Sequence, residues 1–440
     1  MITTEAIVKF IVQPGGKLSG TFRVPGDKSI SHRSIMLGSL AEGVTEVEGF
    51  LEGEDALATL QAFRDMGVRI EGPAQGRVTI HGVGLHGLKP PARPLDLGNS
   101  GTSMRLLSGL MAGQAFDVVM VGDESLSKRP MERVAKPLRS MGAVIETTGD
   151  KGTPPVTVRG GHTLQGIHYE MPVASAQVKS GVLLAGLYAE GETSVTEPAP
   201  TRDHTERMLR GFGYPVEVQG ATARVRGGGK LTATRIDVPA DISSAAFFMV
   251  GASIADGSDI TLQHVGINPT RTGIIDILRL MGADIALLNQ REVGGEPVAD
   301  IRVRSAPLQG IAIPEHLVPL AIDEFPVLFI AAACARGRTV LTGAEELRVK
   351  ESDRIQVMAD GLQIMGISAQ PTPDGIIIDG GQLGSGTVIS HGDHRIAMSF
   401  AMAALRSAGP VTILDCANVA TSFPGFVSLA AGAGLAIRES

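Results

Sequence analysis

Six stretches of the chain share one hydrophobic pattern, in which a short polar segment opens an almost wholly apolar run that ends at a glycine. They cover residues 27–43, 99–113, 175–191, 241–257, 323–337 and 393–409. A helix that is apolar on every side must be buried, so only its polar first turn can meet solvent or a ligand. The pattern therefore predicts six buried helices whose N-termini are suited to binding anions.

A second regular pattern follows each apolar run. After a strand-like stretch such as 258–265 comes another helical segment, and these segments end at Gly67, Gly142, Gly213, Gly282, Gly366 and Gly434. The segment 201–213 is amphipathic, so this second type of helix is expected to pack outside the apolar ones. Two strand-like stretches, for example 68–72 and 77–82, complete the unit. The chain is predicted to form six units of helix, strand, helix, strand, strand, with a repeat of roughly 70 residues.

The repeat predicts an α/β (α+β) fold of two similar domains, each made of three units around its own buried helices. An open solenoid is the first alternative for such a repeat, but a one-layer stack would leave every apolar helix with a wet face. Two domains also suit a length of 440 residues, which exceeds what one hydrophobic core usually covers. We expect a first domain at 24–239 and a second at 1–23 plus 240–440, with crossovers near Val24 and Pro239.

Composition excludes several classes of protein. No apolar run reaches the length of a membrane span without a charge or a glycine, and residues 1–16 lack the pattern of a secretory signal. Cys334 and Cys416 lie in apolar surroundings and are expected to be buried thiols rather than a disulfide or metal pair, so a cytoplasmic location is predicted. A net charge of −7 and 4% aromatic residues argue against a nucleic-acid partner. Lysines and arginines nevertheless gather at the predicted helix starts, which points to a small anionic ligand.

Three helix starts in the first domain carry cations and hydroxyls. Lys28 lies in the first turn of the first run, where the helix dipole disfavours a cation, and Arg33 adds a second cation to a run that should be buried. A solvated lysine is the simpler interpretation, but the pair favours a phosphate or carboxylate ligand. Residues 100–103 are small enough for a ligand to approach the backbone, and Ser175 with Gln177 opens the third run. For these two starts ordinary helix capping remains open.

Between these helices, Lys128 and Arg129 directly precede Pro130, which is expected in the first turn of a helix. A loop carrying two adjacent cations is often merely solvated, and that interpretation also remains open.

The second domain supplies carboxylates. Asp323 and Glu324 precede an apolar run, where a simple capping role for Asp323 remains open. On a helix, Lys350 and Arg354 would share a face and repel each other unless an anion lay between them, either Glu351 or an external ligand. His394 and Arg395 open the last run. If the two domains' residues face one cleft, a phosphorylated substrate and a second anion could be bound while Asp or Glu moves protons. No metal cluster, Ser-His-Asp spacing or dinucleotide fingerprint competes with this interpretation.

The ordered motifs PGDKSISHRS, LGNSGTSMR, SKRPMERV, ASAQVKS, TRDHTE, RVKESDR, DHRIAMSF and ATSFPGF resemble those of the 5-enolpyruvylshikimate-3-phosphate synthases, most closely the bacterial branch described as class II. The resemblance spans nearly the whole chain. It implies an inverse α/β barrel fold of two domains that close on ligand. It also implies transfer of the enolpyruvyl group of phosphoenolpyruvate to the 5-hydroxyl of shikimate 3-phosphate, through a tetrahedral intermediate and without a metal or an organic cofactor. A monomer is expected.

The resemblance also implies roles for individual residues. Proton transfer falls to Lys28, Asp323 and Glu351, with Asp323 accepting the 5-hydroxyl proton and Glu351 protonating the methylene carbon. Shikimate 3-phosphate binding falls to Lys28, Ser29, Arg33, Ser175, Ala176, Gln177, Arg202, Asp323 and Lys350. Phosphoenolpyruvate binding falls to Lys28, Gly101, Arg129, Gln177, Arg354 and Arg395.

Three positions depart from the class I pattern: Ala176 replaces a serine, Thr421 a lysine and Glu346 an asparagine. Gly101 keeps the small residue of inhibitor-sensitive members, so glyphosate is expected to compete with phosphoenolpyruvate.

Two alternatives remain. One is the related transferase acting on UDP-N-acetylglucosamine, most members of which carry a mobile-loop cysteine that is missing from 122–130 here. The other is a non-catalytic phosphosugar-binding repeat protein, which would need neither Asp323 nor Glu351.

Overall fold

The computed structural model describes residues 8–440, which form two compact units. The first unit comprises Gly26–Val238 and the short segment Val293–Glu296. The second unit comprises the described chain up to Pro25 together with Pro239–Glu292 and Pro297–Ser440. The segment 293–296, which the sequence placed with 240–440, therefore groups with the first unit. The predicted second domain also included residues 1–7, which lie outside the described residues.

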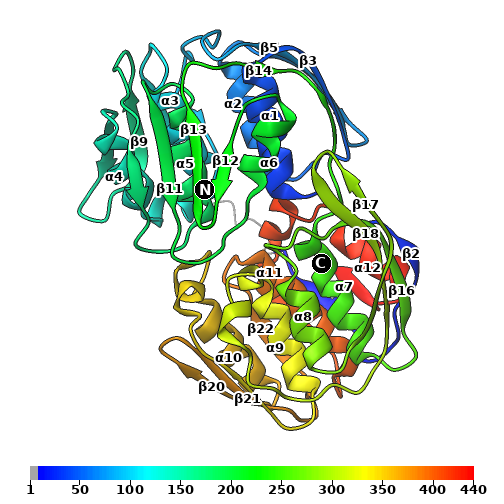
Figure 1. Cartoon of the computed structure of the whole chain (residues 1–440). Coiled ribbons are helices and arrows are strands. Elements are labelled where there is room, and N and C mark those ends of the chain that lie inside the picture. The colour runs from blue at the N-terminus through cyan, green and yellow to red at the C-terminus, as the bar shows by residue number, and fades with distance from the viewer. Residues whose placement is uncertain (1–7) are drawn as a thin grey trace, which may run out of the picture. The chain divides into compact units, whose positions relative to one another are not determined.

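The six apolar runs are helices, as predicted, and each is buried over most of its length. In the first unit they are α1 (Lys28–Leu40), α3 (Gly101–Ala112) and α5 (Ala176–Gly186). In the second unit they are α7 (Ile242–Ile254), α9 (Phe325–Cys334) and α11 (His394–Ala403). Every residue of α7 is buried, which matches its lack of a polar face. Figure 1 shows α7, α9 and α11 running together inside the second unit, where each packs against the other two.

The second helix type is present in all six units. These helices are α2 (Glu54–Asp65), α4 (Glu132–Ser140), α6 (His204–Gly211), α8 (Gly273–Leu280), α10 (Arg354–Ile364) and α12 (Phe426–Ala433). Each ends beside its predicted glycine. Gly67 and Gly142 have φ values of +87° and +103°, a backbone conformation that a side chain would strain.

Three small sheets surround the buried helices of the first unit. The first sheet contains β3 (Ala41–Glu48), β4 (Arg69–Ala74), β5 (Arg77–Val83), β14 (Leu231–Thr232) and β15 (Arg235–Asp237). The second contains β6 (Leu95–Asp96), β7 (Val118–Val121), β8 (Val144–Thr148) and β9 (Thr153–Arg159). The third contains β10 (His168–Glu170), β11 (Glu192–Thr196), β12 (Glu217–Gln219) and β13 (Thr222–Arg226). Their apolar faces and α1, α3 and α5 form one continuous core.

The second unit repeats this plan. Its first sheet contains β2 (Ser19–Phe22), β16 (Asp259–Gly266), β17 (Asp284–Val293) and β18 (Glu296–Arg304). Its second sheet contains β19 (Arg338–Leu341), β20 (Ser368–Thr372) and β21 (Gly375–Asp379). Its third contains β1 (Phe10–Val12), β22 (Gly386–Ile389), β23 (Val411–Leu414) and β24 (Ile437–Glu439). A separate continuous core fills this unit.

Strand pairing reveals how the repeat is closed. In five sheets the strand after the buried helix pairs antiparallel with the second strand of the next hairpin: β3 with β5, β7 with β9, β11 with β13, β16 with β18 and β19 with β21. In the sixth sheet β1 takes that position beside β23. The beginning of the described chain therefore completes the last repeat. No helix within residues 8–440 is long and apolar enough to cross a membrane.

Candidate functional site

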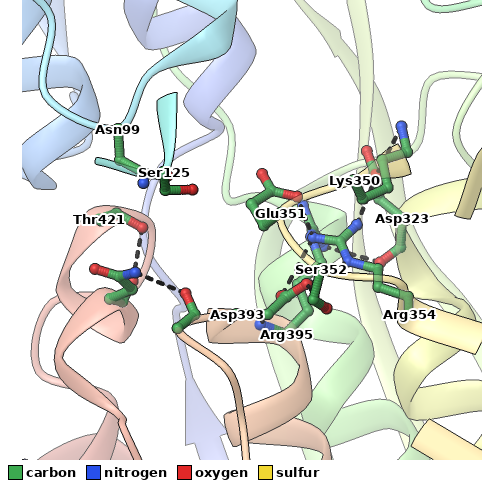
Figure 2. Close-up of polar contacts among 12 residues, drawn as sticks. Asn99, Ser125, Asp323, Lys350, Glu351, Ser352, Arg354, Asp393, Arg395 and Thr421 are labelled. Atoms are coloured by element: carbon green, nitrogen blue, oxygen red, sulfur yellow. Dashed lines mark hydrogen bonds and ion pairs between the residues drawn. The ribbon is translucent and has the colours of Figure 1, made fainter. Parts of the chain in front are cut away.

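The segments at the starts of α9, α10 and α11 bring the predicted site residues of the second unit together around the guanidinium of Arg354. These residues are Asp323, Lys350, Glu351, Arg354 and Arg395. Arg354 is the first residue of α10, and its side chain is only 1% exposed. Its Nε lies 2.9 Å from Asp393 Oδ2, its Nη1 3.3 Å from Asp323 Oδ1 and its Nη2 2.7 Å from Glu351 Oε2. Figure 2 shows these three carboxylates converging on Arg354 from separate segments.

Electrostatics keep this arginine charged. Burial lowers the pKa of the Arg354 guanidinium, but Asp393, Glu351 and Asp323 more than offset that effect, so its pKa is raised overall. One buried cation thus faces three carboxylates.

Asp323 is presented by a short turn rather than by a helix cap. It lies in the 3₁₀ turn η3 (Ile322–Glu324), and the N-cap position of α9 is taken by Glu324, which makes no side-chain cap bond. The capping interpretation of Asp323 was therefore wrong. Arg395 Nη1 donates to the Asp323 carbonyl at 3.1 Å, and Lys350 Nζ lies 3.6 Å from Asp323 Oδ1.

A buried polar chain holds the residue next to Asp323. Glu324 is 3% exposed and accepts a hydrogen bond from Ser243 at the start of α7. Arg271 Nη2 donates to Ser243 Oγ at 2.7 Å and to Asp241 Oδ1 at 2.9 Å. The turn that carries Asp323 is thereby tied to a second buried helix.

Lys350 and Glu351 do not lie on a helix with Arg354. They connect the 3₁₀ turn η4 (Glu345–Val349) to α10, which Asp353 caps by accepting from Gln356 N at 3.0 Å. The expectation that Lys350 and Arg354 share a helix face was wrong, because the cap starts the helix at Arg354. The simpler interpretation of Glu351, as the ion-pair partner of Arg354, describes this structure.

Sequence reasoning missed Asp393. It is fully buried, caps α11 by accepting from Arg395 N at 3.0 Å, and accepts from Ser352 Oγ at 2.9 Å. Its position as an aspartate directly before the predicted helix was the available signal. That signal predicts the helix cap but not the bond to Arg354, because Arg354 belongs to a different repeat.

The start of α1 in the first unit is organised as predicted. Asp27 caps the helix by accepting from Ile30 N at 2.9 Å, and Lys28 is its first residue. Lys28 Nζ lies 3.1 Å from Asp55 Oδ2. Asp55 sits in the first turn of α2, where the helix dipole favours a carboxylate. Asp55 is thus a further partner that the sequence did not identify.

Arg33 lies deeper in the same unit and is 4% exposed. Its Nε donates to Thr205 Oγ1 at 2.7 Å, its Nη2 to Ser180 Oγ at 3.0 Å and its Nη1 to the Ser29 carbonyl at 2.9 Å. Burial lowers the pKa of Arg33 to about 10, which still leaves it charged at neutral pH. Arg202, in the segment before α6, adds to this lowering because it places a like charge nearby.

The starts of α3 and α5 are joined by hydrogen bonds. Arg105 Nη1 donates to Gln177 Oε1 at 2.5 Å, and Gln177 Nε2 donates to Thr102 Oγ1 at 2.9 Å. Ser175 caps α5 by accepting from Val178 N at 3.3 Å, so the capping role left open for it is present. Ala176 is the first residue of α5.

Gly101 lies beside two arginines. A Cβ at Gly101 would come within 3.0 Å of Arg105 Nη1 and 3.3 Å of Arg129 Nη1. Arg129 Nη2 donates to Asn99 Oδ1 at 2.9 Å and to Ser125 Oγ at 3.2 Å. The first turn of α3 therefore faces two guanidinium groups, which suits a phosphate.

The structure corrects the expectation for Pro130 and favours one of the two interpretations of Lys128. α4 begins at Glu132, so Pro130 is not in its first turn. Lys128 is exposed and pairs with Glu124 at 2.6 Å, in agreement with the solvated interpretation.

Of the two cysteines that the sequence predicted to be buried, Cys416 is buried and Cys334 is only partly buried; Thr421 is also buried. Cys334 and Cys416 are free cysteines, and burial raises the pKa of each to about 12. Thr421 Oγ1 donates to the Asn418 carbonyl at 2.6 Å. Within residues 8–440 no group of three or more histidine, cysteine or acidic residues could hold a metal ion.

Comparison with known proteins gives consistent matches. The family model described as EPSP synthase (3-phosphoshikimate 1-carboxyvinyltransferase) matches residues 12–429. The chain is 72% identical over 433 residues to a 3-phosphoshikimate 1-carboxyvinyltransferase from Methylococcus capsulatus, covering 98% of this chain and 99% of that relative. A solved EPSP synthase from Acinetobacter baumannii is 67% identical with a TM-score of 0.89, covering 98% of this chain and all of the other.

The fold extends to more distant proteins. The enolpyruvyl transferase NikO from Streptomyces tendae matches with a TM-score of 0.81 over 99% of both chains, at 18% identity. The predicted fold class is confirmed as the enolpyruvyl transferase fold.

Proposed function

The chain belongs to the EPSP synthase family, and from that premise we propose which of its residues perform each step of the family reaction. The protein is a transferase of the shikimate pathway that moves the enolpyruvyl group of phosphoenolpyruvate to the 5-hydroxyl of shikimate 3-phosphate and releases phosphate. The 5-oxygen adds to C2 of phosphoenolpyruvate while C3 gains a proton. The tetrahedral adduct then loses phosphate from C2 and a proton from C3.

Asp323 is proposed as the base that takes the 5-hydroxyl proton. Glu351 is proposed to protonate C3 and afterwards to remove a proton from the resulting methyl group. Both carboxylates contact Arg354, Asp323 at Nη1 and Glu351 at Nη2. Lys28 is proposed to assist these transfers and to contact both substrates. Every step uses groups of the chain and of the substrates.

Arg354 and Arg395 are proposed to bind the carboxylate of phosphoenolpyruvate. Four contacts already occupy the Arg354 guanidinium: Nε and Nη2 with Asp393, Nη1 with Asp323 and Nη2 with Glu351. A guanidinium has five N–H donors and a bidentate substrate carboxylate needs two of them, so it must displace at least one of these four contacts. We propose that the displaced carboxylate is that of Asp323 or Glu351, which releases one of them for proton transfer when phosphoenolpyruvate binds.

Phosphate recognition is assigned to the first unit. Gly101, Arg129 and Gln177 are proposed to bind the phosphoenolpyruvate phosphate, which fits the two guanidinium groups beside the first turn of α3. Ser175, the Ala176 backbone and Arg202 are proposed to bind the 3-phosphate together with Lys350. Ser29 and Arg33 are proposed to bind the carboxylate of shikimate 3-phosphate.

The convergence of Asp323 and Glu351 on Arg354 carries the proposed assignment. The test is phosphate release from phosphoenolpyruvate with shikimate 3-phosphate as acceptor, and with UDP-N-acetylglucosamine as the control acceptor. Release should require shikimate 3-phosphate and should be lost in Asp323→Ala. Full activity of Asp323→Ala would contradict the assignment, and release with UDP-N-acetylglucosamine alone would contradict the substrate.

Three further properties are proposed. Glyphosate should compete with phosphoenolpyruvate, because Gly101 leaves space beside Arg105 and Arg129 that a side chain would fill. The protein should sediment as a monomer of 45.8 kDa. A cytoplasmic location fits the biosynthetic role of its bacterial relatives.

A further inference from the structure

Arg33 is held by two hydroxyl groups that have no assigned role. Thr205 on α6 is 1% exposed and accepts from Arg33 Nε at 2.7 Å. Ser180 on α5 is fully buried and accepts from Arg33 Nη2 at 3.0 Å. Thr205 Oγ1 also donates to Ser180 Oγ at 2.7 Å, so the two hydroxyls form one hydrogen-bonded pair against the guanidinium.

The helices that carry these hydroxyls are fixed by a buried ion pair next to them. Lys179 Nζ lies 2.9 Å from Glu206 Oε1 and 3.2 Å from Glu197 Oε2. Lys179 directly precedes Ser180, and Glu206 directly follows Thr205. Because Lys179 and Glu206 are each about 3% exposed, the contact between α5 and α6 is shielded from solvent. Thr205 and Ser180 are therefore rigidly placed.

The hydrogen bonds of Arg33 leave N–H donors on both of its terminal nitrogens available. A guanidinium group has five N–H donors, one on Nε and two on each terminal nitrogen. Thr205 takes the donor on Nε, the Ser29 carbonyl takes one on Nη1, and Ser180 takes one on Nη2. Among the residues that the structure describes, no other group accepts from Arg33, so one donor remains on each terminal nitrogen. One donor on each terminal nitrogen is what a carboxylate needs for a two-point contact with a guanidinium.

We propose that Thr205 and Ser180 are positioning residues, which orient Arg33 so that its two terminal nitrogens bind the carboxylate of shikimate 3-phosphate. This inference rests on the proposed role of Arg33 in binding that carboxylate. Preorganisation explains the benefit: an arginine already fixed in its bound rotamer loses less conformational entropy when the ligand arrives.

The test measures binding of shikimate 3-phosphate by calorimetry. Thr205→Val removes the hydroxyl but keeps the branched shape, and it should weaken binding about tenfold, which corresponds to about 1.4 kcal/mol. The KM for phosphoenolpyruvate should change less than about twofold, because Arg33 does not contact that substrate in the proposed scheme. Thr205→Ser keeps a hydroxyl and should restore most of the affinity.

Ser180→Ala provides a smaller change should Thr205→Val fail to fold, and it should weaken binding in the same direction. Ser34→Ala is the matched control. Ser34 is fully buried on α1, and its hydroxyl donates only to the Ile30 carbonyl of its own helix. It should leave the affinity unchanged. Equal weakening by Ser34→Ala would overturn the inference, since any buried hydroxyl would then have the same effect.

A double-mutant cycle separates this inference from the proposed function. In an Arg33→Ala background, Thr205→Val should cause almost no further loss of affinity, because both changes remove the same interaction. Independent, additive losses would overturn the positioning role while leaving the role of Arg33 intact. An Arg33→Ala variant that binds shikimate 3-phosphate normally would instead refute the proposed role of Arg33.

Discussion

Single residues in this chain acquire their chemistry from partners that are distant in sequence. Arg354 meets Asp323 from the start of its own repeat and Asp393 from the next repeat, and Arg33 meets Thr205 from a segment far along the chain. The residue types and their places at helix starts could be predicted from the sequence. Their partners could not, because Asp55 and Thr205 carry no local signal that points to Lys28 or Arg33. Capping rules identify Asp393 as a helix cap but do not predict its bond to Arg354.

Glu351→Gln should separate ion pairing from proton transfer. Glutamine keeps an oxygen that can accept from Arg354, whose Nη2 lies 2.7 Å from Glu351 Oε2. It cannot donate or accept the transferred proton, so kcat should fall by about 10² to 10⁴-fold while the KM for phosphoenolpyruvate does not rise. Steady-state kinetics test this, with the exposed Glu345→Gln as control. A kcat within threefold of the parent would show that Glu351 transfers no proton.

Gly101→Ala should affect phosphoenolpyruvate and glyphosate selectively. The added Cβ would lie 3.0 Å from Arg105 Nη1 and 3.3 Å from Arg129 Nη1, so both side-chain tips must shift slightly. We expect the KM for phosphoenolpyruvate and the inhibition constant of glyphosate to rise several-fold, with binding of shikimate 3-phosphate unchanged. Gly211→Ala, where a Cβ would meet nothing within 4 Å, is the control. Unchanged constants for both anions would place their site elsewhere.

At the scale of elements, the six repeats use similar helices but different first turns. Asp27, Ser100, Ser175, Asp241 and Asp393 each cap a buried helix, whereas the start of α9 lacks a side-chain cap and presents Asp323 instead. The helices themselves were predictable because a continuous apolar run has no other stable environment. The first residues of α4 and α10 were not predictable from the sequence. A capping residue or a turn shifts a helix boundary by a few positions without changing the hydrophobic pattern of the segment.

Asp393→Asn should distinguish helix capping from charge. Asparagine is as good an N-cap as aspartate, so α11 should keep its bond to Arg395 N. The negative charge beside Arg354 Nε is lost, and the KM for phosphoenolpyruvate should rise by at least tenfold because Arg354 is no longer fixed. Asp393→Ala should lose a further ~1 kcal/mol of unfolding free energy through the missing cap. Urea titration and kinetics of both variants test this, and a normal KM in Asp393→Asn would show that Arg354 does not need this partner.

At the scale of the whole molecule, the unfolding free energy depends on groups whose pKa differs between the folded and unfolded chain. His32 is one such group. It is fully buried, and its Nδ1 lies 2.8 Å from Thr59 Oγ1. Burial lowers the pKa of His32 well below 6.5, and the charges of Lys28 and Arg33 lower it further. The folded protein therefore keeps this imidazole neutral in mildly acidic solution.

The sign of the resulting pH dependence follows from proton uptake. Below a pH of about 6.5 the unfolded chain protonates His32 and the folded chain does not, so acid favours unfolding. The stabilising contribution is complete above that pH and is lost as the pH falls toward the folded pKa, by up to about 1.4 kcal/mol per pH unit. His32→Asn, which cannot titrate, should flatten this slope.

All 3 tyrosines, Tyr169, Tyr188 and Tyr214, lie in the first unit with His32, and the chain has no tryptophan. Tyrosine fluorescence during urea unfolding at pH 7.5, 6.5 and 5.5 therefore reports on the unit that contains the substitution. The exposed His162→Asn serves as control, and an unchanged slope in His32→Asn would mean that His32 is not the group whose protonation couples acid to unfolding.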